Sequence, residues 1–372
     1  MAKIKLPYGK GTAEAVIPDE RLKGVLTCGA HGYHVDKPEG DLIREAMEHP
    51  IGSPRLRELS RGKKNIVLIA SDHTRPVPSR LLFPALLSEI REGNPDAVVT
   101  VLIATGFHRP TTREELAAKF GEEYMDRDDI RFVVHKGYEA GNMVEAGILP
   151  SGGLLKVNRI AAEADLLIAE GFIEPHFFAG FSGGRKSVLP GVCSAETVMA
   201  NHCSKFIASP FARTGNLPGN PIHEDMVYAA KKLGLAFILN VALDSEKKVI
   251  RAFAGDFDMA HQAGCEFVGG LAGVKAVPAD IVISTNGGWP LDQNIYQSVK
   301  GMTAAEAACK PGGVIIMVSE CIEGHGSQSL YDTFASGEEK EAIMKRFLET
   351  PMEATEPDQW QAQIMCRVLL KH

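Results

Sequence analysis

Three polar segments of this chain each follow a short apolar run and carry side chains that could bind or transform a small molecule. Residues 71–78, 105–110 and 171–191 come directly after the runs 66–70, 98–104 and 164–170. Because ligand sites of parallel α/β sheets form just beyond the carboxyl ends of the strands, we expect these segments to face one crevice. They would bring together a carboxylate, a guanidinium, two imidazoles and an ammonium group, from Asp72, Arg75, His108, His176 and Lys186.

Each of these residues has an ordinary explanation when it is taken alone. Asp72 and Arg75 are three residues apart, a spacing at which an ion pair often stabilises a turn. A histidine that follows a strand, such as His108, is most often a hydrogen-bonded loop residue. The recurrence of polar segments after successive strands favours a shared site, in which the imidazoles could exchange protons near neutral pH.

The third segment contains a glycine-rich loop with the sequence GFSGGRKS at 180–187. It resembles the triphosphate pattern G-x-x-x-x-G-K-[ST], but Arg185 stands where the last glycine is required, so the match fails. Gly183 and Gly184 could still offer backbone N–H groups to a single phosphate. No G-x-G-x-x-G follows the first strand, and residues 324–329 end in serine, so a conventional nicotinamide site is poorly supported.

Two later segments carry further candidates. His202 has no second ligand at i+3 or i+4, so by itself it is a weak metal signal and is better explained as a structural residue. Tyr296, Gln297 and Lys300 follow a predicted strand, and the i, i+4 spacing places Tyr296 and Lys300 on one face of a helix. That face could close over the first domain, or it could be an ordinary helix start with a solvated lysine.

The elements that position these residues have an α/β pattern. Apolar, β-branched runs alternate with amphipathic segments such as 79–92 and 303–309, as buried parallel strands and crossover helices do. The predicted strands lie at 66–70, 98–104, 130–135, 164–170, 281–285 and 314–319. Alternation at 3–8 and 12–17, and again across 237–254, predicts two hairpins.

The chain has 372 residues, enough for two domains at about 150 residues each. Three glycines within 269–273 indicate a boundary, although a helix C-cap would explain them too. We therefore expect an N-terminal cofactor-binding α/β domain at 1–270 and a C-terminal α/β domain at 271–372. The chain stops directly after a helical pattern at 358–370, so we expect the second domain to be truncated.

Composition excludes several classes of partner. With 40 Lys and Arg against 47 Asp and Glu, the formal charge of −7 gives no reason to expect nucleic acid or an anionic membrane. The seven cysteines form no C-x-x-C pair, which indicates reduced thiols. No apolar run approaches the roughly 18 residues of a membrane span or signal region, so a cytoplasmic location is predicted.

Together these motifs resemble the nickel-pincer lactate racemase family. The resemblance spans nearly the whole chain and rests on SDHTRPVP at 71–78, GFHR at 106–109, PHFFAGFSGGRK at 175–186, NH at 201–202 and YQSVKGM at 296–302. It implies two α/β domains with the active site between them. It also implies a nickel-pincer nucleotide, the nickel complex of pyridinium-3,5-bisthiocarboxylic acid mononucleotide, which cofactor-synthesis proteins would supply.

The resemblance assigns the cofactor contacts. Lys186 is the implied covalent anchor and His202 the implied protein ligand of nickel, whose square-planar environment soft donors suit. The loop with Gly183 and Gly184 would receive the cofactor phosphate. Trp360 would lie against the cationic ring of the cofactor, although a buried core tryptophan is an equal alternative.

The same resemblance assigns the substrate contacts. His108 and His176 are the implied bases, one for each enantiomer, and Asp72 would orient Arg75 or a cofactor hydroxyl group. Four further residues would bind the carboxylate and the reacting oxygen of the substrate: Arg75, Tyr296, Gln297 and Lys300.

A racemase of short 2-hydroxy acids, most favourably lactate, is therefore predicted. Loss of the α-hydrogen as a proton would create a second negative charge, whereas its loss as hydride gives a neutral, planar ketone that can be reduced on either face. The alternatives are a nicotinamide-dependent 2-hydroxy-acid oxidoreductase, a racemase or epimerase of a larger 2-hydroxy acid, and a non-catalytic nickel- or nucleotide-binding protein.

Overall fold

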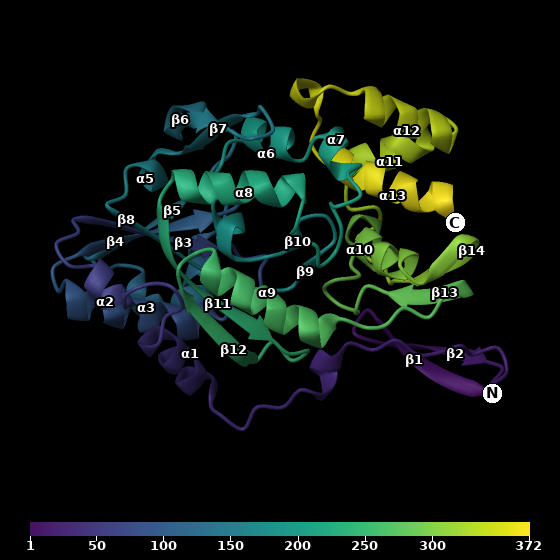
Figure 1. Ribbon diagram of the computed structural model, residues 1–372, viewed down its shortest axis with the longest axis horizontal. Helices are drawn as coiled ribbons and strands as arrows, with labels where there is room; N and C mark the ends of the chain where they lie inside the picture. The colour runs from purple at the N-terminus through teal and green to yellow at the C-terminus, as the bar shows by residue number, and fades with distance from the viewer. The chain divides into compact units, whose positions relative to one another are not determined.

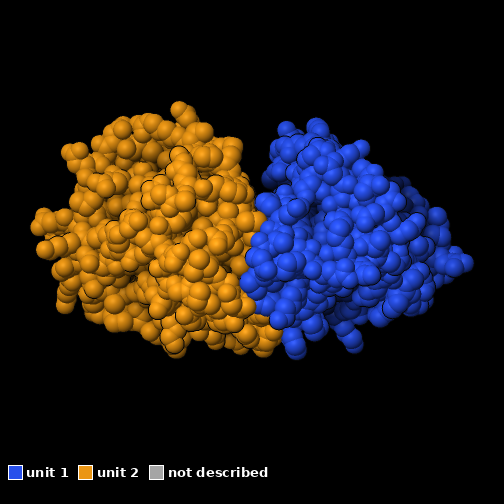
Figure 2. Space-filling model, turned by 90° about the horizontal axis from the view of Figure 1, so that it is seen from above, with its two compact units in different colours: residues 1–27, 202–214, 274–372 blue, residues 28–201, 215–273 orange. Residues whose placement is uncertain are grey.

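The computed structural model describes the backbone of residues 1–372 and all side chains except those of residues 30 and 31. Two compact units are each assembled from separate stretches of the chain (Figures 1 and 2). Unit 1 comprises residues 1–27, 202–214 and 274–372, and unit 2 comprises residues 28–201 and 215–273. Helix α9 (Met259–Ala272) continues through the predicted glycine boundary and is capped by Gly273, where the units divide. The two contiguous domains expected at 1–270 and 271–372 stay a prediction.

Unit 2 is built on a six-stranded sheet in the order β12-β11-β8-β3-β4-β5 (Figure 1). Neighbouring strands pair in parallel except for β12, which runs antiparallel to β11. The strands are β3 (Asn65–Ser71), β4 (Val98–Ala104), β5 (Ile130–Val134), β8 (Leu166–Phe172), β11 (Leu235–Leu243) and β12 (Val249–Gly255). The α/β fold class, the four predicted strands of this region and the hairpin across 237–254 are confirmed.

Helices cover both faces of this sheet. Val249 and Ile250 are neighbours on β12, yet Val249 joins the core shared with α1 (Glu39–Glu48) and α3 (Ser79–Gly93), whereas Ile250 joins the core shared with α9. Because side chains alternate between the faces of a strand, the two cores lie on opposite faces. Residues 66–70 of β3 are consequently buried on both sides, which explains their uninterrupted apolar sequence.

Shorter elements complete unit 2. The helices are α2 (Leu56–Leu59), α4 (Arg113–Phe120), α5 (Arg159–Ala162), α6 (Ala195–Asn201) and α8 (Pro221–Lys232), and the 3-10 turns are η1 (Gly29–Gly32), η2 (Glu122–Tyr124), η3 (Ala140–Asn142) and η4 (Gly184–Ser187). Two small hairpins, β6 (Met143–Ile148) with β7 (Leu154–Asn158) and β9 (Pro175–His176) with β10 (Gly180–Phe181), were not predicted from the sequence.

Unit 1 contains a parallel strand pair, β13 (Ala279–Thr285) and β14 (Cys309–Val318), packed with α10 (Ile295–Glu306). Its other helices are α7 (Ser204–Ile207), α11 (Gln328–Ala335), α12 (Lys340–Glu349), η5 (Met352–Ala354) and α13 (Gln359–Lys371). The hairpin of β1 (Ala2–Tyr8) and β2 (Gly11–Ile17) confirms the predicted alternation. The helix predicted at 303–309 was wrong at its end, because α10 stops at Glu306 and β14 begins at Cys309.

Hydrogen bonds attach the distant segments of unit 1 to residues 274–372. Gly9 N donates to the buried carboxylate of Asp292 at 2.7 Å. Gln363 of α13 donates through Nε2 to the buried carbonyl of Ser204 at 3.0 Å. Because a buried polar group that loses its partner is costly, these bonds hold residues 1–27 and 202–214 in the same unit as the C-terminal part.

All seven cysteines are free thiols. None of the helices in the part of the chain that the structure describes combines the length and hydropathy that a membrane span requires.

Two adjacent leucines of α3 provide a test of this packing. Leu82 is fully buried, whereas Leu81 is 39% exposed. We expect Leu82→Ala to lower the free energy of unfolding by about 2–5 kcal/mol, because it leaves a cavity between α3 and the sheet. Leu81→Ala, the matched control, should lower it by less than about 1 kcal/mol. Urea unfolding monitored by circular dichroism measures both, and equal losses would contradict the assigned core.

Candidate active site

The predicted loops of unit 2 meet because β8, β3 and β4 are adjacent parallel strands. Asp72 follows β3, and His108 lies in the segment after β4. His108 Nδ1 lies 2.6 Å from Asp72 Oδ2, so two residues separated by 36 positions are in direct contact. Both residues were predicted from the sequence to belong to the site, but their contact with each other was not predicted.

Asp72 is held as a carboxylate although it is 1% exposed. Its Oδ1 accepts hydrogen bonds from Thr74 N at 3.1 Å and Thr74 Oγ1 at 2.7 Å. Burial alone would raise the pKa of Asp72, but the hydrogen bond and charge of His108, the Thr74 hydroxyl and the Arg75 charge outweigh burial and lower it. An ionised Asp72 accepts the Nδ1 hydrogen of His108, and the neutral imidazole then has a proton-accepting Nε2.

A half-buried lysine supports the loop that carries Arg75. Lys119, in the last turn of α4, donates through Nζ to the carbonyls of Arg75 and Val77 at 3.3 Å each. Burial lowers the pKa of Lys119, while the nearby carboxylates of Glu170 and Asp72 oppose that shift. The loop backbone is thereby fixed, and the Arg75 side chain itself is exposed.

Glu170 of β8 lies at the same edge of the sheet and is fully buried. Ser79 Oγ, in the first turn of α3, donates to Glu170 Oε1 at 2.5 Å. Burial raises the pKa of Glu170, and the Lys119 charge and the Ser79 hydroxyl only partly oppose this. A buried acid, a half-buried lysine and a serine in the first turn of α3 thus underlie the loops that carry the candidate residues.

His176 and Lys186 both contact the ring of Phe178. The Phe178 and His176 ring centroids are 4.6 Å apart in an edge-on arrangement, and Lys186 Nζ lies 5.8 Å from the Phe178 centroid. Ala179 N donates to His176 Nδ1 at 3.3 Å, so the hydrogen of the neutral imidazole is on Nε2. Sequence analysis did not single out Phe178, although the pair of phenylalanines after His176 was a visible signal.

Gly183 and Gly184 have positive φ angles of +78° and +52°. A Cβ atom on Gly184 would lie 2.7 Å from the ring of His261, and one on Gly183 would lie 2.6 Å from Asn240 Oδ1. Gly184 N donates to the same Asn240 oxygen at 2.7 Å. Conformation and close packing therefore require both glycines, and their role in binding a phosphate stays a prediction.

In unit 1, His202 and Trp360 are in contact. Their ring centroids are 5.0 Å apart with the planes at 72°, and both side chains are buried. Trp360 lies in the first turn of α13, and His202 comes just before α7. The structure therefore brings together two residues that are 158 positions apart and that the family resemblance assigns to the cofactor.

The three candidate residues of unit 1 lie near the start of α10, which begins at a side-chain cap. Asn294 accepts the N–H of Gln297 at 2.9 Å, which places Tyr296, Gln297 and Lys300 in the first two turns. Lys300 Nζ donates to Gln297 Oε1 at 2.7 Å, and Tyr296 Oη donates to Asp358 Oδ1 at 2.8 Å. Asp358 was not predicted as part of this set, because its only sequence signal was its position near Trp360.

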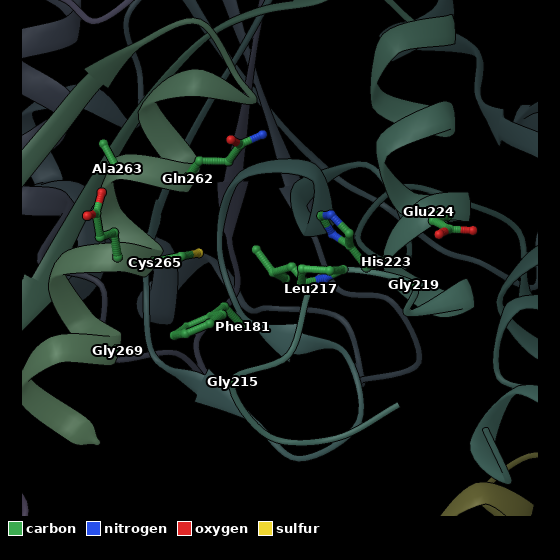
Figure 3. Close-up of a pocket in the computed structure, with 12 residues that line it drawn as sticks. Phe181, Gly215, Leu217, Gly219, His223, Glu224, Gln262, Ala263, Cys265 and Gly269 are labelled. Atoms are coloured by element: carbon green, nitrogen blue, oxygen red, sulfur yellow. The ribbon is translucent and has the colours of Figure 1, made fainter. Parts of the chain in front are cut away.

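A cavity of about 800 Å³ in unit 2 is lined by none of the predicted residues. It lies between α9, the first turn of α8 and the loop at 215–219 (Figure 3). Among its lining side chains are Phe181, Leu217, His223 and Cys265.

His135 shows why a histidine after a strand does not by itself indicate a site. Its Nδ1 accepts from Asn158 Nδ2 at 3.1 Å and its Nε2 donates to Cys193 O at 3.0 Å. Burial lowers the pKa of His135 to about 4, against which the bond to Cys193 has a smaller, opposite effect. This imidazole is neutral and structural.

Comparison with known proteins relates the whole chain to one group of enzymes. Residues 8–215 match the lactate racemase N-terminal domain and residues 274–372 match the lactate racemase C-terminal domain. Over 372 residues the chain is 57% identical to a lactate racemase of Thermoanaerobacterium thermosaccharolyticum and 54% identical to one of Lactiplantibacillus plantarum. Each alignment covers 100% of this chain and 87% of the relative.

Solved structures agree with this relationship. The lactate racemase apoprotein of T. thermosaccharolyticum superposes with a TM-score of 0.96 at 56% identity, covering 100% of this chain and 87% of that chain. A Thermotoga maritima protein has a TM-score of 0.64 at 21% identity, covering 89% of this chain and 81% of that chain, and it shares the fold.

The buried histidine predicts how stability depends on pH. With a pKa of about 4 in the fold and an ordinary value near 6.5, His135 binds its proton earlier in the unfolded chain. Its contribution to stability is complete above pH 6.5 and is lost as the pH falls towards 4. We expect His135→Gln to be less stable at pH 7.5 but to show a shallower decline in unfolding free energy between pH 6.5 and 4.5. Urea titrations across that range measure the slope, and an unchanged slope would rule out this assignment.

Proposed function

The chain belongs to the lactate racemase family and is an isomerase, and on this premise we propose that it interconverts the two enantiomers of lactate. The observation that carries the proposal is the 54–57% identity to two lactate racemases over every residue of the chain. The nicotinamide-dependent oxidoreductase is set aside, because these relatives are named racemases and the chain lacks a dinucleotide fingerprint after its first strand.

Cationic and amide side chains are proposed to bind the substrate carboxylate and the reacting oxygen. The planar guanidinium of Arg75 can form two parallel hydrogen bonds to a carboxylate, and its loop is fixed by Lys119. When Gln297 Oε1 accepts from Lys300, the amide nitrogen of Gln297 is the atom that can donate to substrate. Tyr296, oriented by Asp358, would add a further contact to the same ligand.

His108 is proposed to take the hydroxyl proton of one enantiomer. Its bond to Asp72 keeps the hydrogen on Nδ1, so Nε2 can accept a proton, and the carboxylate then stabilises the imidazolium that forms. His108 would hold this proton while the α-hydrogen leaves as hydride to the acceptor that the bound cofactor would supply, so the substrate would pass through a neutral ketone. This route avoids the dianion that removal of the α-hydrogen as a proton would create.

His176 is proposed to serve the other enantiomer. In the present arrangement its Nδ1 accepts from Ala179 N, and the neutral ring carries its hydrogen on Nε2. Taking a proton at Nε2 therefore requires the Nδ1 bond to Ala179 to be released. The two histidines would thus differ in which nitrogen carries the hydrogen. Nε2 of His108 can accept a proton as it stands, whereas Nε2 of His176 can do so only after a change in hydrogen bonding.

The residues fit the nickel-pincer nucleotide by the chemistry of their donors. Among the side chains described, no group of three or more His, Cys, Asp or Glu is placed to hold a metal ion, so a metal at His202 must take most of its donors from a bound organic group. Lys186 has an amine that can form the covalent anchor, and Trp360, next to His202, provides an aromatic surface for a cationic ring. When bound, this cofactor would supply a reversible hydride acceptor.

Several finer assignments belong to the same proposal. Asp72, Gly183 and Gly184 are proposed cofactor contacts in addition to the structural contacts described above. Cofactor-synthesis proteins are the proposed partners, and the cytoplasm is the proposed location. Lactate is favoured over a larger 2-hydroxy acid because both relatives are named for it.

The covalent anchor can be tested by mass. Protein produced together with the cofactor-synthesis proteins should carry an adduct that is absent from Lys186→Ala, because no other residue is proposed to form the link. Lys231→Ala, which alters an exposed lysine of α8, is the matched control and should retain the adduct. Intact-mass spectrometry decides the matter, and identical masses for wild type and Lys186→Ala, after allowing for the substitution, would defeat the tethering proposal.

The proposal of one base for each enantiomer predicts losses of kcat that differ in size among the variants. His108→Ala and His176→Ala should each lower kcat for lactate interconversion by at least about 100-fold, because each removes a proton acceptor. Asp72→Asn, which keeps the side chain's size but removes its charge, should lower kcat by a smaller factor, and the exposed His49→Ala should not change it. Chiral chromatography of both reaction directions measures these rates.

A single-turnover assay distinguishes the two histidines. With loaded enzyme in excess over substrate, we expect His108→Ala to form pyruvate from one enantiomer only and His176→Ala to form it from the other. Full racemase activity in either histidine variant, or pyruvate from the same enantiomer in both, would be incompatible with one base for each enantiomer.

A further inference from the structure

Arg185 is the residue that breaks the triphosphate-binding pattern, and the proposed function leaves it without a role. It is 1% exposed and is one of the largest fully buried side chains of the protein. A buried guanidinium is costly unless its hydrogen-bond donors are satisfied. Its position directly before Lys186 therefore calls for a physical explanation.

The segment ahead of Arg185 folds around its guanidinium. Nη1 donates to Phe181 O at 2.7 Å and Gly183 O at 3.2 Å, and Nη2 donates to Ala179 O at 2.7 Å. Nε donates to His223 Nδ1 at 3.1 Å. Four carbonyls within residues 179–183, of which Ser182 O is the most distant at 3.5 Å, thus point at one planar group. This geometry suits the branched, planar donors of an arginine rather than the ammonium group of a lysine.

No carboxylate among the described side chains forms an ion pair with Arg185. Burial lowers the pKa of Arg185 to about 10, so it is still a cation at neutral pH. Burial and the Arg185 charge together lower the pKa of His223 to about 4 and hold the pKa of His261 well below its usual range. The positive charge is therefore stabilised by carbonyl dipoles and by neutral imidazole, with backbone atoms as its main partners.

Two of the carbonyls that bind Arg185, those of Ala179 and Phe181, belong to the hairpin of His176. Strand β9 pairs with β10 so that His176 is opposite Gly180, and Phe181 is opposite Pro175. Ala179, whose carbonyl binds Arg185, also donates its N–H to His176 Nδ1. The guanidinium is thus one residue along the chain from Lys186 and two hydrogen bonds from His176.

We propose that Arg185 is a positioning residue whose buried guanidinium organises residues 179–184 and thereby sets the places of both His176 and Lys186. The inference rests on the proposed function, in which these two residues are a base and the cofactor anchor. It also explains why arginine takes the place of glycine in this loop: the segment is organised around an internal cation instead of an external triphosphate.

The test compares two arginine-to-lysine substitutions in the same unit. Arg185→Lys keeps the positive charge but loses the planar, branched arrangement of N–H donors. Arg91→Lys is the control, because Arg91 also donates to backbone carbonyls, those of Pro95 and Ala97, at the opposite end of the strands. Unlike Arg185, Arg91 has a carboxylate partner, Asp129, at 2.7 Å. Hydrogen–deuterium exchange of the protein without cofactor is measured first. The fraction carrying the cofactor adduct is measured next, after production with the cofactor-synthesis proteins.

We expect Arg185→Lys to accelerate exchange in peptides covering 174–190 and to lower the adduct fraction at least about tenfold, while Arg91→Lys leaves both unchanged. Unchanged exchange over 174–190 in Arg185→Lys would overturn the inference. If wild type carries no adduct, the proposed function fails, and the exchange measurement alone decides the role of Arg185.

If the amide hydrogens of Arg185→Lys exchange rapidly throughout unit 2, a milder variant provides the test. His223→Leu removes only the acceptor of Nε and should accelerate exchange over 174–190 by a smaller factor, with the rest of the unit protected. Faster exchange elsewhere without an effect on 174–190 would overturn the inference in this case. In loaded protein, the same variant should lower kcat more than it changes KM for lactate, because His176 is displaced and Arg75 is not.

Discussion

The parallel pairing of β3 with β4 and β8 is the constraint on which the candidate site of unit 2 depends. Ser71 is opposite Ala104, and Ile69 is opposite Ala169, so the three strands reach their carboxyl ends together. Adjacent strands are about 4.8 Å apart, which allows the segments that follow them to touch. The 2.6 Å contact between Asp72 and His108 follows from this register, and a slip by one residue would move every side chain of the strand to the opposite face of the sheet.

The buried ionisable groups near this edge of the sheet are stabilised in different ways. Asp72 is stabilised as an anion by His108 and Thr74, whereas burial raises the pKa of Glu170, which accepts a hydrogen bond from Ser79. Arg185 is enclosed by backbone carbonyls. The hydrogen bonds of these groups restrict side-chain motion, and rigidity is what a site needs to hold a base and an anchor in place.

The histidines show how environment separates roles that the residue type leaves open. His135 and His108 both follow strands of the same sheet, and both use Nδ1 in a hydrogen bond. His135 is buried with an amide and a carbonyl, so it is neutral and inert, whereas His108 is 39% exposed and paired with a carboxylate. His176 has a third arrangement, in which its Nδ1 accepts from the backbone.

The sequence by itself determined the six predicted strands, the two larger hairpins and the motifs that carry the family resemblance, because hydrophobic periodicity depends on neighbours along the chain. Tertiary structure decided the partner of Asp72, the contact of His176 and Lys186 with Phe178, the burial of Arg185 and the assembly of unit 1 from three segments. These features depend on strand order, register and the closing of long loops. No local pattern encodes which of two distant segments will be neighbours, so only the folded chain shows it.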